Sequence, residues 1–212
     1  MKKIFLIGLV LLVAVLAGGC ASYTVQNIPS RMDDNKVVKT GDNEILITAL
    51  PILTEEDGRK YFDANLIGKN IVAVHLNILN FSSDVAEFAE SNLTINNSIL
   101  TQLSVEDVYR VIRREYTAKA IAWLSITYGV GGPILAAHTA GINKKIMEDL
   151  QSKCLKLGDI VKSKASIQGF LLFKIPDEAM RDDKLLSSNL GISIKKGGKL
   201  VKYSLPIPSS KN

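Results

Sequence analysis

A run of 23 residues in the middle of the chain, Ala120 to Ile142, contains no Asp, Glu, Lys or Arg and is long enough on paper to cross a bilayer. Four glycines and a proline interrupt it. The sequence GVGGP at 129–133 disfavours helix, because glycine costs backbone entropy and proline restricts the residue before it. As a helix, the part before this break would span only about 14 Å of a hydrocarbon core about 30 Å thick. We therefore expect two helices joined at the break.

Helical spacing on both sides of the break predicts a helical hairpin at about 104–157. Ser104 followed by Asp107 is a capping-box-like start, since the hydroxyl can accept an early helical N–H and the acid is favoured by the helix dipole. The second helix is expected to begin near Ile134 and to continue to Gly158. Apolar residues at spacings of three and four mark one face of each helix: Val105, Val108 and Ile112, then Ile142, Ile146 and Leu150.

Small residues recur at every fourth position of the second helix, at Gly132, Ala136 and Ala140. Such a ridge lets another backbone approach closely. Packing of this helix against the first helix or the sandwich is the favoured interpretation, because globular helix pairs also use alanine ridges. The alternative is a contact surface for lipid or for another protein, in which Trp123 and Tyr128 would supply interfacial aromatic rings.

The helical hairpin interrupts a β pattern that begins at Glu44. Asp57-Gly58 reads as a turn, Asn96-Asn97 as a tight hairpin, and Gly197-Gly198 as a strong hairpin signal. Short strands with frequent turns on both sides of the helices predict a mainly β fold, an antiparallel immunoglobulin-like β-sandwich over 44–212 with an α insertion. The clearest strand alternates between two faces, with Val72, Val74, Leu76 and Ile78 on one and Ala73, His75 and Asn77, the polar face, on the other.

The N-terminus has the tripartite pattern of an export signal: Lys2 and Lys3, an uncharged apolar core, and small residues. The stretch from Leu16 to Cys20, LAGGC, resembles the lipobox of bacterial lipoproteins. That resemblance implies cleavage between Gly19 and Cys20, removal of 1–19 as a lipoprotein signal peptide, and acylation of Cys20 with chains such as palmitate. In the sorting rule of that family, Ala21 implies transfer to the outer membrane.

After the lipobox, residues 20–43 are expected to be the acylated cysteine and a flexible tether reaching about 25 to 30 Å. Loss of Lys2 and Lys3 leaves 24 basic against 21 acidic residues, a net charge of +3. A chain that is mildly basic and exported is not expected to bind nucleic acid. Cys154 is then the one remaining thiol and is expected to be a small buried hydrophobe, with reactivity or dimerisation as the alternative.

Catalytic and metal-binding patterns are absent from the sequence. It contains no G-x-S-x-G, no H-E-x-x-H, no paired C-x-x-C and no phosphate loop ending in Lys-Ser/Thr. His75 and His138 lie on separate predicted elements, with no carboxylate at ligand spacing from either. We therefore expect no enzyme, no catalytic residues, no metal and no cofactor.

The stretch KCLKLGDIVKSKAS carries four lysines: Lys153, Lys156, Lys162 and Lys164. A run of this density is expected to be a solvated edge that also discourages aggregation of the sheet. The alternative is contact with anionic lipid or glycan.

The predicted layout resembles small bacterial lipoproteins of unassigned role that carry an immunoglobulin-like sandwich with a helical insertion. From the lipobox and the absence of catalytic motifs we expect a non-enzymatic protein of the cell envelope, bound to the membrane through its N-terminal lipid, that acts as a binding or scaffold module for another envelope component. The alternative is a self-associating, membrane-perturbing oligomer that uses the Gly/Ala-rich hairpin. The sequence leaves the binding partner, the oligomeric state and the periplasmic or surface face open.

Overall fold

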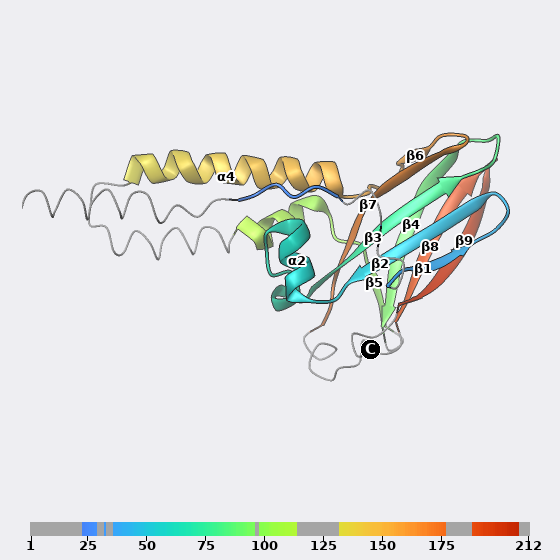
Figure 1. Ribbon diagram of the computed structural model, residues 1–212, viewed down its shortest axis with the longest axis horizontal. Coiled ribbons are helices and arrows are strands. Elements are labelled where there is room, and N and C mark those ends of the chain that lie inside the picture. Colours follow the sequence, from blue (N-terminus) through green and yellow to red (C-terminus); the bar gives the residue numbers. More distant parts are fainter. Residues whose placement is uncertain are drawn as a thin grey trace, which may run out of the picture.

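The computed structural model of the chain describes residues 23–28, 32, 36–95, 98–113, 132–176 and 188–207, and of residues 132–139 it describes the backbone alone. Two antiparallel sheets pack face to face, and helices lie against the outer side of one of them (Figure 1). The longest helix projects well beyond the end of the sheets (Figure 1).

The first sheet has the strand order β1-β2-β3-β7, and the second has the order β5-β4-β8-β9 with the short strand β6 also paired to β4. Every pairing between these strands is antiparallel. The strands are β1 (Val38–Gly41), β2 (Ile45–Ile52), β3 (Ile71–Asn80), β4 (Ala86–Ile95), β5 (Ser98–Thr101), β6 (Ile160–Val161), β7 (Ala165–Lys174), β8 (Ser188–Lys196) and β9 (Lys199–Ile207). The helices are α2 (Glu55–Phe62), the 3-10 turn η1 (Ile67–Lys69), a helix at 105–113 and α4 (Gly132–Lys153).

The strand order is that of an immunoglobulin-like sandwich. The chain passes from the first sheet to the second between β3 and β4, and again between β7 and β8. In immunoglobulin nomenclature, β2, β3 and β7 stand in the places of strands A, B and E, while β5, β4, β8 and β9 stand in those of C′, C, F and G. The helical insertion lies between β5 and β6, which confirms the predicted fold class: a mainly β antiparallel sandwich interrupted by helices.

Two hydrophobic cores lie on opposite faces of the first sheet. Alternate residues of β3, such as Val72 and Val74, enter the core between the two sheets. Their neighbours Ile71 and Ala73 enter a second core, formed by the outer face of this sheet with α2, α4 and the helix at 105–113. Because both faces are covered, β3 is apolar almost throughout. On the face of β3 predicted to be polar, Ala73 and His75 are buried and Asn77 is half-buried.

Helix α2 replaces the turn predicted at Asp57-Gly58. Thr54 is its N-cap, with its hydroxyl accepting from the backbone N–H of Asp57 at 3.1 Å, and the first turn is entirely acidic. Gly58 is buried within the helix, where an added Cβ would lie 3.3 Å from the Ala64 carbonyl oxygen. The turn prediction was wrong because favourable capping and tertiary packing offset the low helix propensity of one glycine.

The described parts of the insertion agree with a helical hairpin. Ser104 Oγ accepts from the backbone N–H of Asp107 at 3.1 Å, as the capping pattern predicts. The predicted apolar faces of both helices are buried, although α4 begins at Gly132 and ends at Lys153 and does not continue to Gly158. The buried residues are Val105, Val108 and Ile112, then Ile142, Ile146 and Leu150. Residues 114–131 lie outside the described part of the chain.

Both ends of the insertion are fixed to β7, an edge strand of the first sheet. The backbone N–H of Leu103 donates to the Leu172 carbonyl at 2.7 Å, and that of Leu155 donates to the Phe170 carbonyl at 3.1 Å. The side chain of Gln102 then joins the two ends, since its Nε2 donates to the Leu155 carbonyl at 2.8 Å. These contacts cover an edge that would otherwise offer unpaired backbone groups.

Two of the three predicted tight turns can be compared with the structure. Gly197 and Gly198 join β8 to β9 with φ values of 53° and 78°, a left-handed conformation that glycine adopts without strain. This hairpin prediction is confirmed, whereas the turn at Asp57-Gly58 is the helix described above. Asn96-Asn97, between β4 and β5, lies outside the described residues.

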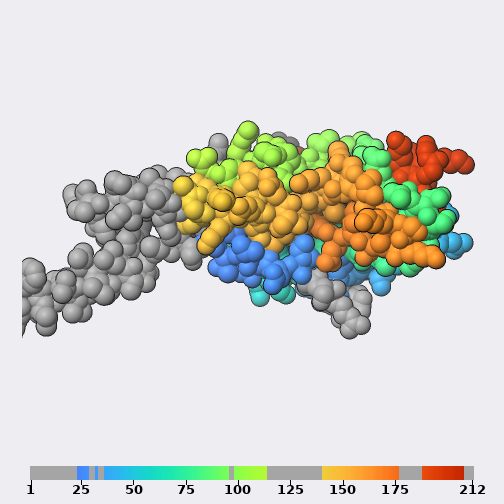
Figure 2. All heavy atoms as spheres, turned by 90° about the horizontal axis from the view of Figure 1, so that it is seen from above, coloured from blue at the N-terminus to red at the C-terminus, as the bar shows by residue number. Residues whose placement is uncertain are grey.

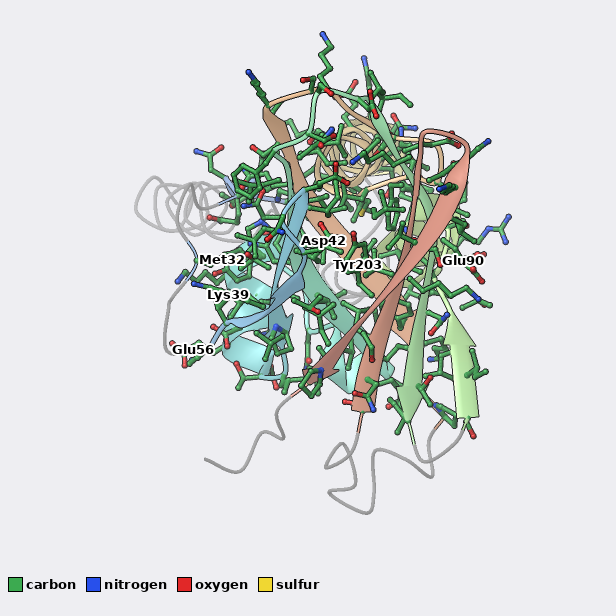
Figure 3. All side chains as sticks on the ribbon, turned by 90° about the vertical axis from the view of Figure 1, so that its right-hand side faces the viewer. Met32, Lys39, Asp42, Glu56, Glu90 and Tyr203 are labelled. Atoms are coloured by element: carbon green, nitrogen blue, oxygen red, sulfur yellow. The ribbon has the colours of Figure 1, made fainter. Side chains whose placement is uncertain are left out.

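The described residues between 23 and 43 do not form a flexible tether. Tyr23 is buried with 5% of its surface exposed, and Val38–Gly41 form β1 beside β2. Asp42 faces Tyr203 of β9, whose hydroxyl donates to Asp42 Oδ2 at 2.7 Å across the edge between the sheets (Figure 3). This hydrogen bond lowers the pKa of Asp42 below its ordinary value. The predicted tether is thereby corrected, because parts of it belong to the folded domain.

Candidate functional site

The residues predicted to carry function are placed only in part by the structure. Seven of the residues considered for function lie outside the described residues or are described by backbone alone, and Ala140 is exposed on α4. The residues outside the described part of the chain are Gly19, Cys20, Trp123 and Tyr128. The residues described by backbone alone, all in α4, are Gly132, Ala136 and His138. Among the described residues the structure brings together a different set, centred on the C-terminal half of α4.

A buried ion pair occupies this half of α4. Lys153 Nζ lies 2.6 Å from Asp149 Oδ2, and the two side chains are 4% and 0% exposed. Lys153 also donates to the Tyr61 carbonyl at 2.7 Å and lies 5.8 Å from the centre of the Phe62 ring. A buried charge is costly unless it is paired and hydrogen-bonded, and here the lysine has both kinds of contact.

Tyr23 completes the cluster from the other end of the chain. Its hydroxyl donates to Asp149 Oδ2 at 2.5 Å, and the neighbouring backbone N–H of Thr24 donates to Asp63 Oδ2 at 2.8 Å. The N-terminal segment is thus bound to α4 and to the end of α2. Tyr23 follows Cys20, the residue predicted to be acylated, by three positions. We call Tyr23, Asp149 and Lys153 the Tyr23 cluster.

Sequence reasoning missed the Tyr23 cluster and placed Lys153 wrongly at a solvated edge. A signal was nevertheless available in the spacing of α4. Asp149 and Lys153 continue the buried stripe of Ile142 and Ile146 at steps of three and four. A charged pair on an apolar stripe indicates a buried ion pair, whereas no pattern in the sequence links Tyr23 to a residue 126 positions away.

Substitution of Tyr23 by Phe is expected to lower the free energy of unfolding by about 1.5–3 kcal/mol, because it removes a hydrogen bond to a buried carboxylate. Hydrogen exchange at 24–28 should accelerate more than exchange in the sheets, since the segment would lose its main attachment. Tyr109→Phe, at a half-buried tyrosine of the helix at 105–113, is the matched control. Exchange at 24–28 as fast in the unsubstituted protein as in a free peptide would contradict the docked position of Tyr23.

His75 lies in the second core and not on a polar face. It is 0% exposed and stacks on Phe170, with 4.8 Å between the ring centres. Neither ring nitrogen has a hydrogen-bond partner among the described residues. Burial therefore lowers the pKa of His75 to about 4, which keeps the ring neutral near pH 7.

Cys154 is buried next to the Tyr23 cluster, with 8% of its surface exposed. Burial, assisted by the nearby Asp149 carboxylate, raises the pKa of its thiol to about 12. A thiol that stays protonated and covered reacts slowly. The prediction of a small buried hydrophobe is confirmed.

The described residues also bear on metal binding and on membrane crossing. Within them, no group of three or more His, Cys, Asp or Glu side chains is arranged to hold a metal ion. None of the helices in the described ranges combines the length and apolar character that a bilayer crossing requires.

Comparison with known proteins found solved structures at low sequence identity. No family model matches the chain, and no curated protein matches it. The crystal structure of the yjhA protein from Bacillus subtilis is similar with a TM-score of 0.36 and 12% identity, covering 73% of this chain and 76% of that one. The crystal structure of a functionally unknown protein from Listeria monocytogenes EGD-e has a TM-score of 0.39 and 9% identity, covering 92% and 93%. The strand order itself defines the class: an immunoglobulin-like β-sandwich with a helical insertion.

Proposed function

We propose that the chain is a lipid-anchored protein of the cell envelope, without enzymatic activity, that acts as a binding or scaffold module for another envelope component. The lipobox-like stretch ending at Cys20 supports the anchor. Diacylated and N-acylated cysteine would hold the protein durably, since each buried methylene contributes about 0.8 kcal/mol. The sorting rule applied to Ala21 favours the outer membrane as the membrane that holds this anchor.

The observation that carries this proposal is the docking of Tyr23. The third residue after Cys20 is built into the folded domain, where its hydroxyl donates to a buried carboxylate. Such an arrangement suits a protein whose N-terminus is held at a surface. The docking of Tyr23 supports a scaffold role, since it would fix the domain relative to its anchor.

A surface for the binding role is available on the second sheet. Helices cover the outer face of the first sheet, whereas β4, β8 and β9 expose polar and charged side chains on the outer face of the second. Glu90 of β4 points away from the sandwich on this side (Figure 3). The exposed residues of these three strands include Glu90, Asn189, Lys195, Lys202 and Ser204, and also the apolar Leu200 and Val201. A partner of complementary charge could recognise this face, since complementary charges contribute to the association rate and to specificity more than to affinity.

The anchor is tested by Cys20→Ser in cells fed a fatty acid analogue that can be tagged. The unsubstituted chain should incorporate the analogue and remain with membranes, whereas Cys20→Ser should lose the label completely and leave the membranes on carbonate washing. Cys154→Ala changes the other cysteine and should keep both properties. A Cys20→Ser chain that stays embedded after carbonate washing would refute the lipid anchor.

A further inference from the structure

One face of the molecule combines the N-terminal segment, α4 and the chain that follows α4. Seen from above, residues 23–28, α4 and residues from 155 onward lie side by side (Figure 2). The connection between β3 and β4 adjoins them, because Ser163 Oγ donates to the Ser82 carbonyl at 2.8 Å and Asn80 Nδ2 donates to the Val161 carbonyl at 3.2 Å. We call the exposed side of residues 23–28, 81–85, 140–152 and 156–164 the α4 face.

Large apolar side chains are exposed preferentially on the α4 face. Of the eight that are exposed among the described residues, five belong to its segments. Single exposed apolar residues are ordinary, but a concentration of them on one side indicates a contact surface. The five are Val25 (54% exposed), Phe81 (54%), Val85 (53%), Leu157 (60%) and Ile160 (50%).

Positive charge accompanies these apolar side chains. The segments of the α4 face carry five exposed lysines against three acids that are not buried, and one of those acids, Glu148, is paired with Lys144 at 3.7 Å. The lysines are Lys144, Lys145, Lys156, Lys162 and Lys164, and the acids are Asp84, Glu148 and Asp159. Lysines interspersed with aliphatic and aromatic residues suit an anionic lipid surface, where each lysine near the headgroups contributes about 1 kcal/mol.

The length of chain between the anchor and the domain restricts where the bilayer can be. Three residues, from Cys20 to Tyr23, span at most about 11 Å even when fully extended. Tyr23 is bound to Asp149 of α4, so an acylated Cys20 cannot be far from this side of the domain. The face nearest the anchor is therefore also the face with exposed apolar and basic residues.

We propose that the α4 face lies on the bilayer that holds Cys20 and binds its anionic headgroups, so that the domain rests on the membrane. This inference depends on the proposed lipid anchor. In this arrangement Leu157 and Ile160 enter the headgroup region, and the lysines around them contact phosphate groups. The outer face of the second sheet is directed elsewhere and remains accessible to a partner.

The test uses the mature acylated chain, purified from cells and reconstituted into vesicles of phosphatidylcholine and phosphatidylglycerol. A fluorescent label on Leu157→Cys should lose emission when the headgroups carry nitroxide quenchers. The same label on Ile99→Cys, 70% exposed on β5, should keep its emission. The unsubstituted chain controls for labelling, because Cys154 is buried and its raised pKa of about 12 keeps the thiol unreactive.

Charge reversal tests the headgroup contact separately. Lys156→Glu combined with Lys162→Glu should reduce quenching at Leu157→Cys in anionic vesicles, and added salt should reduce it in the unsubstituted background. Lys60→Glu with Lys174→Glu changes the same number of exposed lysines on α2 and β7 and should leave the quenching unchanged.

The outcomes separate this inference from the proposed function. Mass spectrometry that finds no acyl group on Cys20 would overturn the anchor and both proposals with it. If the protein is acylated and bound to vesicles but its Leu157→Cys label is not quenched, the membrane contact alone is overturned. A protein partner would then be the expected occupant of the α4 face. Equal quenching of the Leu157 and Ile99 labels would also overturn it, since no preferred face would exist.

Discussion

Lys153→Met is expected to lower the free energy of unfolding by about 3–5 kcal/mol, because it leaves the Asp149 carboxylate buried without its cation. Methionine keeps most of the side-chain length beside the Phe62 ring, so the loss reports the charge and its hydrogen bonds. The carbonyl of Tyr61 loses its donor as well. Urea unfolding followed by circular dichroism would show a lower midpoint, with the free energy obtained by linear extrapolation.

The control for this prediction lies on the same helix. Lys145→Met removes an exposed lysine from α4 and should change stability by less than about 0.5 kcal/mol. In a double-mutant cycle, Asp149→Asn combined with Lys153→Met should lower the free energy of unfolding by clearly less than the sum of the two single substitutions. Once one partner of the ion pair is gone, the other substitution only removes a buried charge that has lost its partner. Equal midpoints for Lys153→Met and Lys145→Met would show that the ion pair is not buried as described.

A loss of stability on acidification is expected from His75, whose pKa in the folded protein is about 4 against an ordinary value of 6.5. The folded state binds this proton less readily than the unfolded state. His75 therefore leaves stability unchanged above about pH 6.5 and lowers it as the pH falls from there to about 4, by about 3 kcal/mol in total. Unfolding free energies measured at intervals across this range would reveal the slope.

His75→Leu isolates this effect from the titration of the acidic residues. The substitution should remove the His75 part of the pH dependence, so that the difference between the two proteins grows on acidification. At neutral pH it should raise stability by about 1–3 kcal/mol, since it eliminates two buried nitrogens that lack partners among the described residues. Parallel stability curves for the two proteins between pH 6.5 and 4 would show that the histidine is not held neutral by burial.

Local patterns predicted much of the fold because they depend on neighbours in sequence. The alternation in β3, the Gly197-Gly198 hairpin and the cap at Ser104 each follow from a few adjacent residues, and the structure contains all three. The insertion between strands was also predictable, since helical spacing replaces the β pattern there and the β pattern returns afterwards.

The features that the sequence did not predict depend on distant partners. No pattern in the residues around Tyr23 predicts its burial, because its partner Asp149 lies 126 residues away. His75 looks polar-facing within its strand, but α2 and α4 close over that side of the sheet and bury it. Whether a face is covered is decided by elements elsewhere in the chain, so alternation alone identifies the two faces of a strand and not their environments.

Both ends of the insertion are attached to β7, so the helices can change in evolution without changing the sandwich. Leu103 and Leu155 donate to carbonyls of β7 that are two residues apart, and the Gln102 side chain joins the two ends. The insertion therefore leaves the sandwich and returns to it at nearly the same place. Arms of other lengths or sequences could therefore be exchanged there while every strand keeps its neighbours. Diversification of such proteins is expected to concentrate in this insertion, much as variable loops do on an invariant frame.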